Sequence, residues 1–262
     1  MYAMARVSTS NGYEIGYEEA GGGPATPIVF LHGVGSDKSV WRPQLAHFGK
    51  SRRSIAFDYP GYGDSDRAPE GTSRDDFASA IMSAMRALGV DRAHVCGLSL
   101  GGVVAIAMHD AAPESCASLI LADTFAVHPD GRAIYERSLA GSQDLPAMAE
   151  ARVDILIAQP AEPEVRREVV ETMSHIDPLA YRIGAEAVWL ADQRDRARAI
   201  RVPALVIVGA EDSITPIQLS TKLASLIAGA DMQVVEGAGH LTNLERPGEF
   251  NQLVEEFLAD LG

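Results

Sequence analysis

A serine at position 99 is flanked by glycines at the spacing Gly97-x-Ser99-x-Gly101. It follows an apolar run that ends at Cys96 and precedes another that begins at Val103. This pattern is typical of a nucleophile elbow, a sharp turn from strand to helix that exposes one hydroxyl and strains its backbone. A chain of this length holds such a pattern by accident about one time in ten, so the rest of the sequence must supply the context.

A serine hydroxyl becomes a nucleophile when a neighbouring base removes its proton and a third group orients that base. His240 lies in a glycine-rich loop after the last apolar run, and we interpret it as the base. Two carboxylates, Asp123 and Asp212, also follow apolar runs. Both satisfy the chain order of serine, acid and histidine. We favour Asp212, with Asp123 as its rival unless Asp123 instead caps the next helix.

Acyl transfer also needs two backbone N–H groups that stabilise the oxyanion. Leu100, directly after the serine, is predicted to supply one of them. Val34, in the flexible loop Gly33-Val34-Gly35 after another apolar run, is predicted to supply the other. His32 is expected to hold this loop through side-chain hydrogen bonds, and the turn-rich loop 58–65 is expected to have a structural task.

These residues need a scaffold that brings the ends of several strands together. Short apolar runs at 27–31, 54–57, 93–96, 118–122, 203–208 and 232–235 alternate with helical stretches. Asn11-Gly12 predicts an antiparallel hairpin before them, Ser73 predicts a helix start, and Thr215 with Pro216 predicts another. The alternation predicts an α/β fold with a mostly parallel central sheet and flanking helices. The carboxyl ends of parallel strands share one edge, where such sheets hold their sites.

The alternation stops between residues 125 and 199. Amphipathic helical segments at 132–139, 145–158, 164–173 and 179–190 replace it. We therefore predict a helical cap at 125–199, inserted within a core domain made of residues 1–124 and 200–262. Additional helices that merely cover the sheet are the alternative.

The composition excludes several classes of function. The 262 residues are 47% hydrophobic and carry a net charge of −14, which disfavours nucleic acid and anionic membrane surfaces as partners. The same charge disfavours an anionic substrate, unless cap arginines such as Arg132, Arg137 or Arg182 gather at the site. No dinucleotide fingerprint or metal-ligand spacing occurs, so neither cofactor nor metal is expected.

The compartment and the assembly are also expectations from sequence. Cys96 and Cys116 lie in apolar runs and are expected to be free, buried thiols. The chain shows no signal peptide and no apolar run near the ~20 residues of a membrane span, so we expect a cytoplasmic protein. A small-molecule substrate is the expected partner, and a homodimer is one option for the assembly.

With these residues in view, the sequence resembles the α/β-hydrolase superfamily over essentially its whole length. The resemblance rests on five landmarks: Leu31-His32-Gly33-Val34-Gly35, Asp58 to Ser65, Gly97 to Gly102, Gly209-Ala210-Glu211-Asp212 and Gly239-His240. Within the superfamily, the chain most resembles 3-oxoadipate enol-lactonases and related small serine esterases, through its elbow and the stretches 35–41 and 200–205. The resemblance implies that Asp212 is the acid.

Two other branches of the superfamily fit less well. Haloalkane dehalogenases and soluble epoxide hydrolases carry aspartate at the position of Ser99. Carbon–carbon bond hydrolases often place tryptophan after the catalytic histidine, where this chain has Leu241. The sequence therefore predicts a serine hydrolase that cleaves a small ester or lactone, without a cofactor, through an acyl-enzyme at Ser99. A carbon–carbon or amide hydrolase with the same triad, and a non-catalytic small-molecule receptor, are the alternatives.

Overall fold

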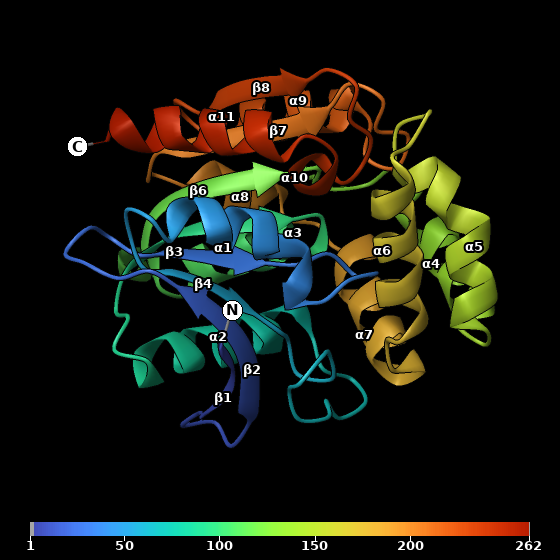
Figure 1. The fold of residues 1–262 in the computed structure, drawn as a ribbon, viewed down its shortest axis with the longest axis horizontal. Helices are drawn as coiled ribbons and strands as arrows, with labels where there is room; N and C mark the ends of the chain where they lie inside the picture. The colour runs from blue at the N-terminus through green and yellow to red at the C-terminus, as the bar shows by residue number, and fades with distance from the viewer. Residues whose placement is uncertain (1–2, 262) are drawn as a thin grey trace.

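The computed structural model describes residues 3–261, whose strands form one eight-stranded sheet in the order β1-β2-β4-β3-β5-β6-β7-β8 (Figure 1). The strands are β1 (Ala3–Ser8), β2 (Glu14–Ala20), β3 (Ile28–Leu31), β4 (Ser54–Phe57), β5 (Ala93–Leu98), β6 (Cys116–Ala122), β7 (Ala204–Gly209) and β8 (Asp231–Val235). The pairs β1–β2 and β2–β4 are antiparallel, and all other neighbours are parallel. The predicted fold class is confirmed.

Helices cover both faces of the sheet because alternate residues of each strand point to opposite sides. Along β3, Ile28 and Phe30 contribute to the core beneath α1 (Arg42–Phe48) and α11 (Pro247–Ala259). Val29 and Leu31 contribute to the core on the opposite face, beneath α2 (Arg74–Ala87), α3 (Leu100–Ala111) and α9 (Ile217–Leu226). Burial on both faces explains why these strands appear in the sequence as continuous apolar runs.

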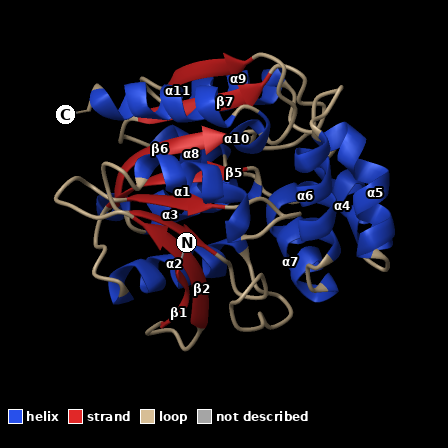
Figure 2. Cartoon of the chain, viewed as in Figure 1, coloured by secondary structure: helices blue, strands red, loops and turns tan. Residues whose placement is uncertain are grey.

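Most of the chain between β6 and β7 forms a separate group of four helices beyond the carboxyl ends of the parallel strands (Figure 1). They are α4 (Gly131–Gly141), α5 (Leu145–Leu156), α6 (Pro163–Ser174) and α7 (Pro178–Trp189). Helix α5 packs against α6, and α4 packs against α7, which also contacts α2 and α3. Figure 2 shows this group as helices and loops beside the sheet. These four helices match the segments that the sequence predicts for the cap.

Two short helices, α8 (Arg194–Ala199) and α10 (Thr242–Glu245), were not predicted from the sequence. Helix α8 lies within the range predicted for the cap, but it contacts α3 and α9 on the sheet layer. Arg196 of α8 pairs there with Asp75 and Asp110. Helix α10 follows His240 directly. At four residues it is too short to show a helical periodicity.

The predicted helix start at Thr215 is wrong. Pro216 is the N-cap of α9, which begins at Ile217, and the Thr215 hydroxyl donates a 2.6 Å hydrogen bond to Asp212 instead of capping the helix. The cysteines agree with the expectation, since Cys96 and Cys116 are free and buried. Across residues 3–261, every helix falls short of the length and apolar character that a bilayer crossing requires.

Candidate active site

Ser99 occupies the turn between β5 and α3, with φ of 54° and ψ of −112°. Such a backbone costs a non-glycine residue about 1–3 kcal/mol and persists only where its surroundings hold it. A Cβ on Gly97 would lie 2.2 Å from the backbone of Gly101, and one on Gly101 would lie 2.0 Å from a carbonyl of β3. The Ser99 N–H donates to Ala122 at 2.9 Å, and the Thr124 hydroxyl donates to the Ser99 carbonyl at 2.8 Å. The neighbouring strand therefore holds the strained turn.

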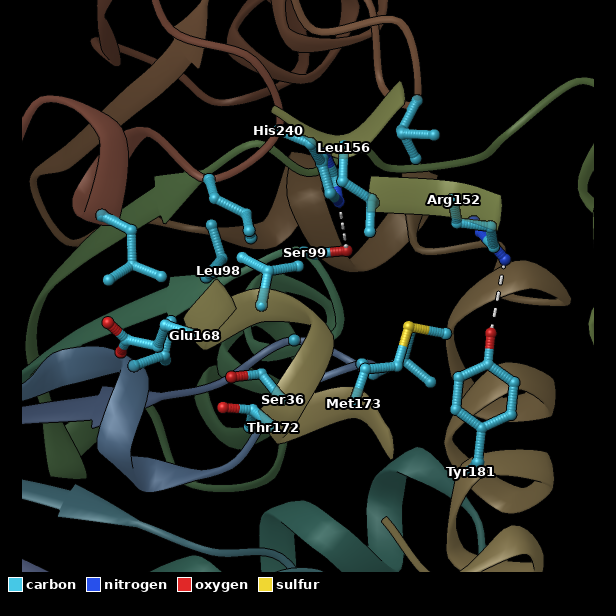
Figure 3. Close-up of a pocket in the computed structure, with 18 of the residues that line it drawn as sticks. Ser36, Leu98, Ser99, Arg152, Leu156, Glu168, Thr172, Met173, Tyr181 and His240 are labelled. Carbon is cyan, nitrogen blue, oxygen red and sulfur yellow. Dashed lines mark hydrogen bonds between the residues drawn. The ribbon is translucent and has the colours of Figure 1, made fainter. Parts of the chain in front are cut away.

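The structure joins Ser99, His240 and Asp212 in one chain of hydrogen bonds. The Ser99 Oγ lies 3.1 Å from His240 Nε2, the contact drawn as a dashed line in Figure 3. On the far side of the ring, His240 Nδ1 lies 2.9 Å from Asp212 Oδ2. The three side chains come from the loops after β5, β8 and β7, and all three are buried. This arrangement leaves Nε2 free to accept the serine proton while Nδ1–H donates to the carboxylate.

The electrostatics of the pair agree with that proton arrangement. Burial lowers the pKa of His240, but the charge and the hydrogen bond of Asp212 outweigh burial and raise it above the ordinary 6.5. Burial raises the pKa of Asp212. The charge of His240 and the hydrogen bonds from His240 and Thr215 outweigh burial, so the pKa lies below its ordinary 3.8. Asp212 is therefore ionised at neutral pH, and it favours the imidazolium form of His240.

The Asp123 carboxyl forms its hydrogen bonds with Gly209 and Thr242 and not with His240. Its Oδ1 accepts the Gly209 N–H at 3.0 Å, and its Oδ2 accepts the Thr242 hydroxyl at 2.7 Å. The expectation that Asp123 caps the first cap helix is wrong, since α4 begins at Gly131. Burial, with the charge of Asp212, raises the pKa of Asp123 to about 8. This buried carboxyl therefore links Gly209, at the end of β7, to Thr242, which lies just after His240.

The two backbone N–H groups predicted for the oxyanion hole lie beside the elbow. Leu100 is the first residue of α3, directly after Ser99, and Val34 lines the same pocket as the serine hydroxyl. Neither N–H has a hydrogen-bond acceptor among the described residues. Unpaired donors of this kind at a helix N-terminus and a neighbouring loop can bind a developing negative charge.

Aromatic side chains of the loop 58–65 brace the loop that carries Val34. His32 donates from Nδ1 to the Gly33 carbonyl at 2.8 Å, as the sequence predicts. The His32 ring lies against Tyr59 and Tyr62, and burial lowers its pKa to about 4, so it is neutral. The Tyr62 hydroxyl donates to the Val34 carbonyl at 3.3 Å. The structural task that the sequence predicts for loop 58–65 is therefore to hold this loop.

The loop of His240 is fastened to the end of α5 and the residues just after it. The His240 N–H donates to the Leu156 carbonyl at the end of α5, at 2.8 Å. Glu245 accepts the N–H groups of Gly239 and Leu241 with one oxygen and that of Ala158 with the other, at 2.6 to 3.2 Å. One carboxylate therefore links the histidine loop directly to the cap.

A pocket opens beside Ser99 and His240 between the sheet edge and helices of the α4–α7 group (Figure 3). Most of its wall is apolar: Val40, Leu98, Leu156, Val169, Met173, Trp189, Ile214, Leu241 and Leu244 line it. Two charged side chains also line it, Arg152 of α5 and Glu168 of α6. Neither residue was identified from the sequence. The signal for Arg152 was its spacing, because it continues the buried stripe of Leu145, Met148 and Ala149.

The three cap arginines considered from the sequence lie elsewhere. Within the described residues, Arg132 and Arg182 line neither the pocket nor the grooves beside it, whereas Arg137 lines an outer groove together with Arg152. No group of three or more His, Cys, Asp or Glu side chains in residues 3–261 is arranged to hold a metal ion.

The chain is similar over nearly its whole length to several hydrolases. A 3-oxoadipate enol-lactonase 2 of Acinetobacter baylyi is 29% identical over 255 residues and covers 94% of each chain. A 2-hydroxymuconate semialdehyde hydrolase of a Pseudomonas species is 30% identical over 252 residues, 91% of this chain and 88% of the relative. The crystal structure of the enol-lactonase from Burkholderia xenovorans LB400 superposes with a TM-score of 0.89 at 29% identity, covering 99% and 100% of the two chains.

The family model of the alpha/beta hydrolase family matches residues 28–253, from the first parallel strand into the last helix. The matched range contains the elbow and both other members of the hydrogen-bonded chain. The named relatives are hydrolases or lactonases that share nearly the full length of the chain. This protein therefore belongs to the alpha/beta hydrolase family.

Proposed function

We propose that this protein is a serine hydrolase that cleaves a small carboxylic ester or lactone, of the enol-lactone type, through an acyl-enzyme on Ser99. The observation that carries the proposal is the hydrogen-bonded chain from Ser99 through His240 to Asp212, set beside a mostly apolar pocket. The similarity to two enol-lactonases supports the choice of substrate. We also propose that α4 to α7 act as the cap that shapes the substrate site.

In the first half of the reaction, Ser99 Oγ bonds to the substrate carbonyl carbon while His240 Nε2 takes the serine proton. The N–H groups of Val34 and Leu100 stabilise the oxyanion. The bond to the leaving oxygen then breaks, and His240 gives its proton to that oxygen. In a lactone, the leaving oxygen remains attached to the acyl group.

In the second half, water attacks the acyl carbon and His240 takes a proton from it. The bond from the acyl carbon to Ser99 breaks, and the proton returns to the serine oxygen. Asp212 keeps the proton of the neutral ring on Nδ1 throughout and stabilises the imidazolium that forms in each half. No other acid or base is needed.

A second candidate is cleavage of a carbon–carbon bond by the same triad. The identity of 30% to a 2-hydroxymuconate semialdehyde hydrolase favours it. Leu241 after the histidine disfavours it, since carbon–carbon bond hydrolases often have tryptophan there. A parallel screen of lactones, linear esters, amides and carbon–carbon substrates distinguishes the candidates by their kcat/KM.

The mechanism is tested with a fluorophosphonate probe and peptide mass mapping. We expect one label per chain, on Ser99, and no label on the Ser99→Ala variant. Hydrolysis should continue for many turnovers in the native protein and stop in the variant, which separates an enzyme from a receptor. A label on another residue, or full esterase activity in Ser99→Ala, would refute the mechanism.

A further inference from the structure

Arg152 is a cationic side chain in the wall of a mostly apolar pocket. Its hydrogen bond runs to the Tyr181 hydroxyl at 3.4 Å, as Figure 3 shows. Among residues 3–261 it forms no ion pair with a carboxylate. The carboxylates nearby in α5, Glu150 and Asp154, pair instead with Arg166 of α6. A guanidinium that lines an apolar pocket and has no carboxylate partner in the described chain is available to bind an anionic group of a ligand.

The surface next to Arg152 is also positive. Arg152 and Ile214 line both the pocket and an outer groove between α4, α5 and the start of α9. Arg137 and Lys222 line that groove as well, and Asp130 is the carboxylate in its wall. On a chain whose net charge is −14, a groove with this excess of cations attracts anions locally.

The opposite side of the pocket carries the opposite charge. Glu168 and Thr172 line both the pocket and a second groove. Carboxylates outnumber cations in the wall of that groove: Glu18, Asp37, Asp64, Glu164, Glu168, Glu171 and Asp177 stand against Lys38, Arg42 and Arg167. Figure 3 shows Arg152 and Glu168 on opposite sides of Ser99. An anionic ligand would therefore be attracted from the Arg152 side and repelled from the Glu168 side. The charges define an orientation for the ligand in the pocket.

We infer that Arg152 binds an anionic group, such as a carboxylate, on the ester or lactone substrate, and that the substrate reaches Ser99 along the groove of Arg137 and Lys222. This inference rests on the proposed function. A guanidinium offers two parallel N–H donors that match the two oxygens of a carboxylate. The Tyr181 hydroxyl, beside the guanidinium, can donate a third hydrogen bond. Arg152 is then a specificity-determining residue, and the apolar wall holds the rest of the substrate.

The test compares two matched esters, 4-nitrophenyl pentanoate and the 4-nitrophenyl monoester of glutaric acid. They differ in whether the acyl chain ends in a methyl or a carboxylate group. The rate with Ser99→Ala protein is subtracted as background. We expect Arg152→Met to lower the ratio of kcat/KM for the anionic ester over the neutral ester about tenfold to hundredfold, mainly through KM. Arg152→Lys, which keeps the charge but not the paired donors, should lie between.

The matched control is Arg132→Met, which removes an exposed cap arginine outside the pocket and should leave the ratio unchanged. The groove is tested by the double variant Arg137→Glu and Lys222→Glu. It should lower kcat/KM for the anionic ester about tenfold at low ionic strength, and much less at high ionic strength. A binding measurement with glutarate and Ser99→Ala protein, with and without Arg152→Met, checks the anchor without any turnover.

The outcomes separate this inference from the proposed function. An unchanged ester ratio and unchanged glutarate affinity in Arg152→Met overturn the inference while the hydrolase stands. Failure of the native protein to hydrolyse either ester, together with no fluorophosphonate label on Ser99, overturns the proposed function instead. Salt-independent rates in the groove variant overturn the route and leave the anchor to be judged by the ester ratio.

Discussion

Replacing Asp212 by asparagine tests the proposed triad most directly. Asp212 Oδ1 accepts the N–H groups of Ile214 and Thr215, both at 2.8 Å, and an asparagine carbonyl can still accept them. The amide nitrogen would then replace Oδ2, 2.9 Å from His240 Nδ1. Because the amide is a donor, Nδ1 must become an acceptor, and the ring proton moves to Nε2. That nitrogen can no longer take the proton of Ser99.

The variant should therefore fold normally and lose almost all turnover. The wrong tautomer costs about 10⁴-fold in kcat, or about 5 kcal/mol of transition-state stabilisation. Steady-state hydrolysis of a 4-nitrophenyl ester measures the loss, and thermal unfolding checks that the protein remains folded.

Asp123→Asn is the matched control. The pKa of Asp123 is raised to about 8, so its carboxyl is largely protonated at pH 7 and a neutral amide resembles it. An amide can accept the Gly209 N–H and donate to the Thr242 hydroxyl. It loses only the long 3.3 Å contact from the Thr242 N–H, so we expect less than a tenfold change in kcat. The assignment of Asp212 as the triad acid is refuted if Asp123→Asn loses orders of magnitude in kcat while Asp212→Asn stays within tenfold of the native protein.

Four further outcomes follow from the structure. The value of kcat/KM should fall as pH drops through the raised pKa of His240, so the midpoint of this fall should lie above pH 6.5. A midpoint below pH 6.5 would contradict the pairing of His240 with Asp212. Because its pKa is raised to about 8, Asp123 should contribute stability that is fully present below pH 3.8 and is lost as pH rises towards 8. Thermal unfolding measures this trend, and the Asp123→Asn variant should not show it. Gly101→Ala should destabilise by about 1–3 kcal/mol or more. Gly248→Ala, an exposed position of α11 with nothing within 4 Å, should not destabilise and should gain up to about 1 kcal/mol in the same denaturant titration. Glu245→Gln should leave the Ala158 N–H without an acceptor, which should destabilise the fold by about 1–3 kcal/mol and slow turnover. A variant with the Tm and kcat of the native protein would show that this link is unimportant.

Local geometry explains why much of the fold could be predicted. Residues 54–57 form a strand as predicted, because a run of apolar residues buried on both faces has few other arrangements. Ser73 caps α2 with Asp76 in a capping box, a contact between residues only three apart. The elbow is equally local, since its glycines are required within one turn. Helices α8 and α10 were missed because short segments carry no periodic signal.

The choice between two acids shows the limit of reasoning from sequence. Asp123 and Asp212 both follow parallel strands, and the order of residues along the chain admits either. Only the folded chain shows that Asp212 lies against His240, while Asp123 is turned to Gly209 and Thr242. Strand order brings both carboxyls to one edge, but side-chain direction decides which one contacts the imidazole.

The sequence by itself therefore determined the chemistry available to this protein: a strained serine, a histidine, carboxylates and two loops with free N–H groups, each specified by neighbouring residues. The tertiary structure decided which of these groups meet and what faces them. It placed Arg152, rather than Arg132, Arg137 or Arg182, in the pocket wall. The physical reason is that spacing along α5 shows only which face of that helix is buried. Packing of α5 against α6, and its contact with the loop of His240, decide that this face meets the pocket.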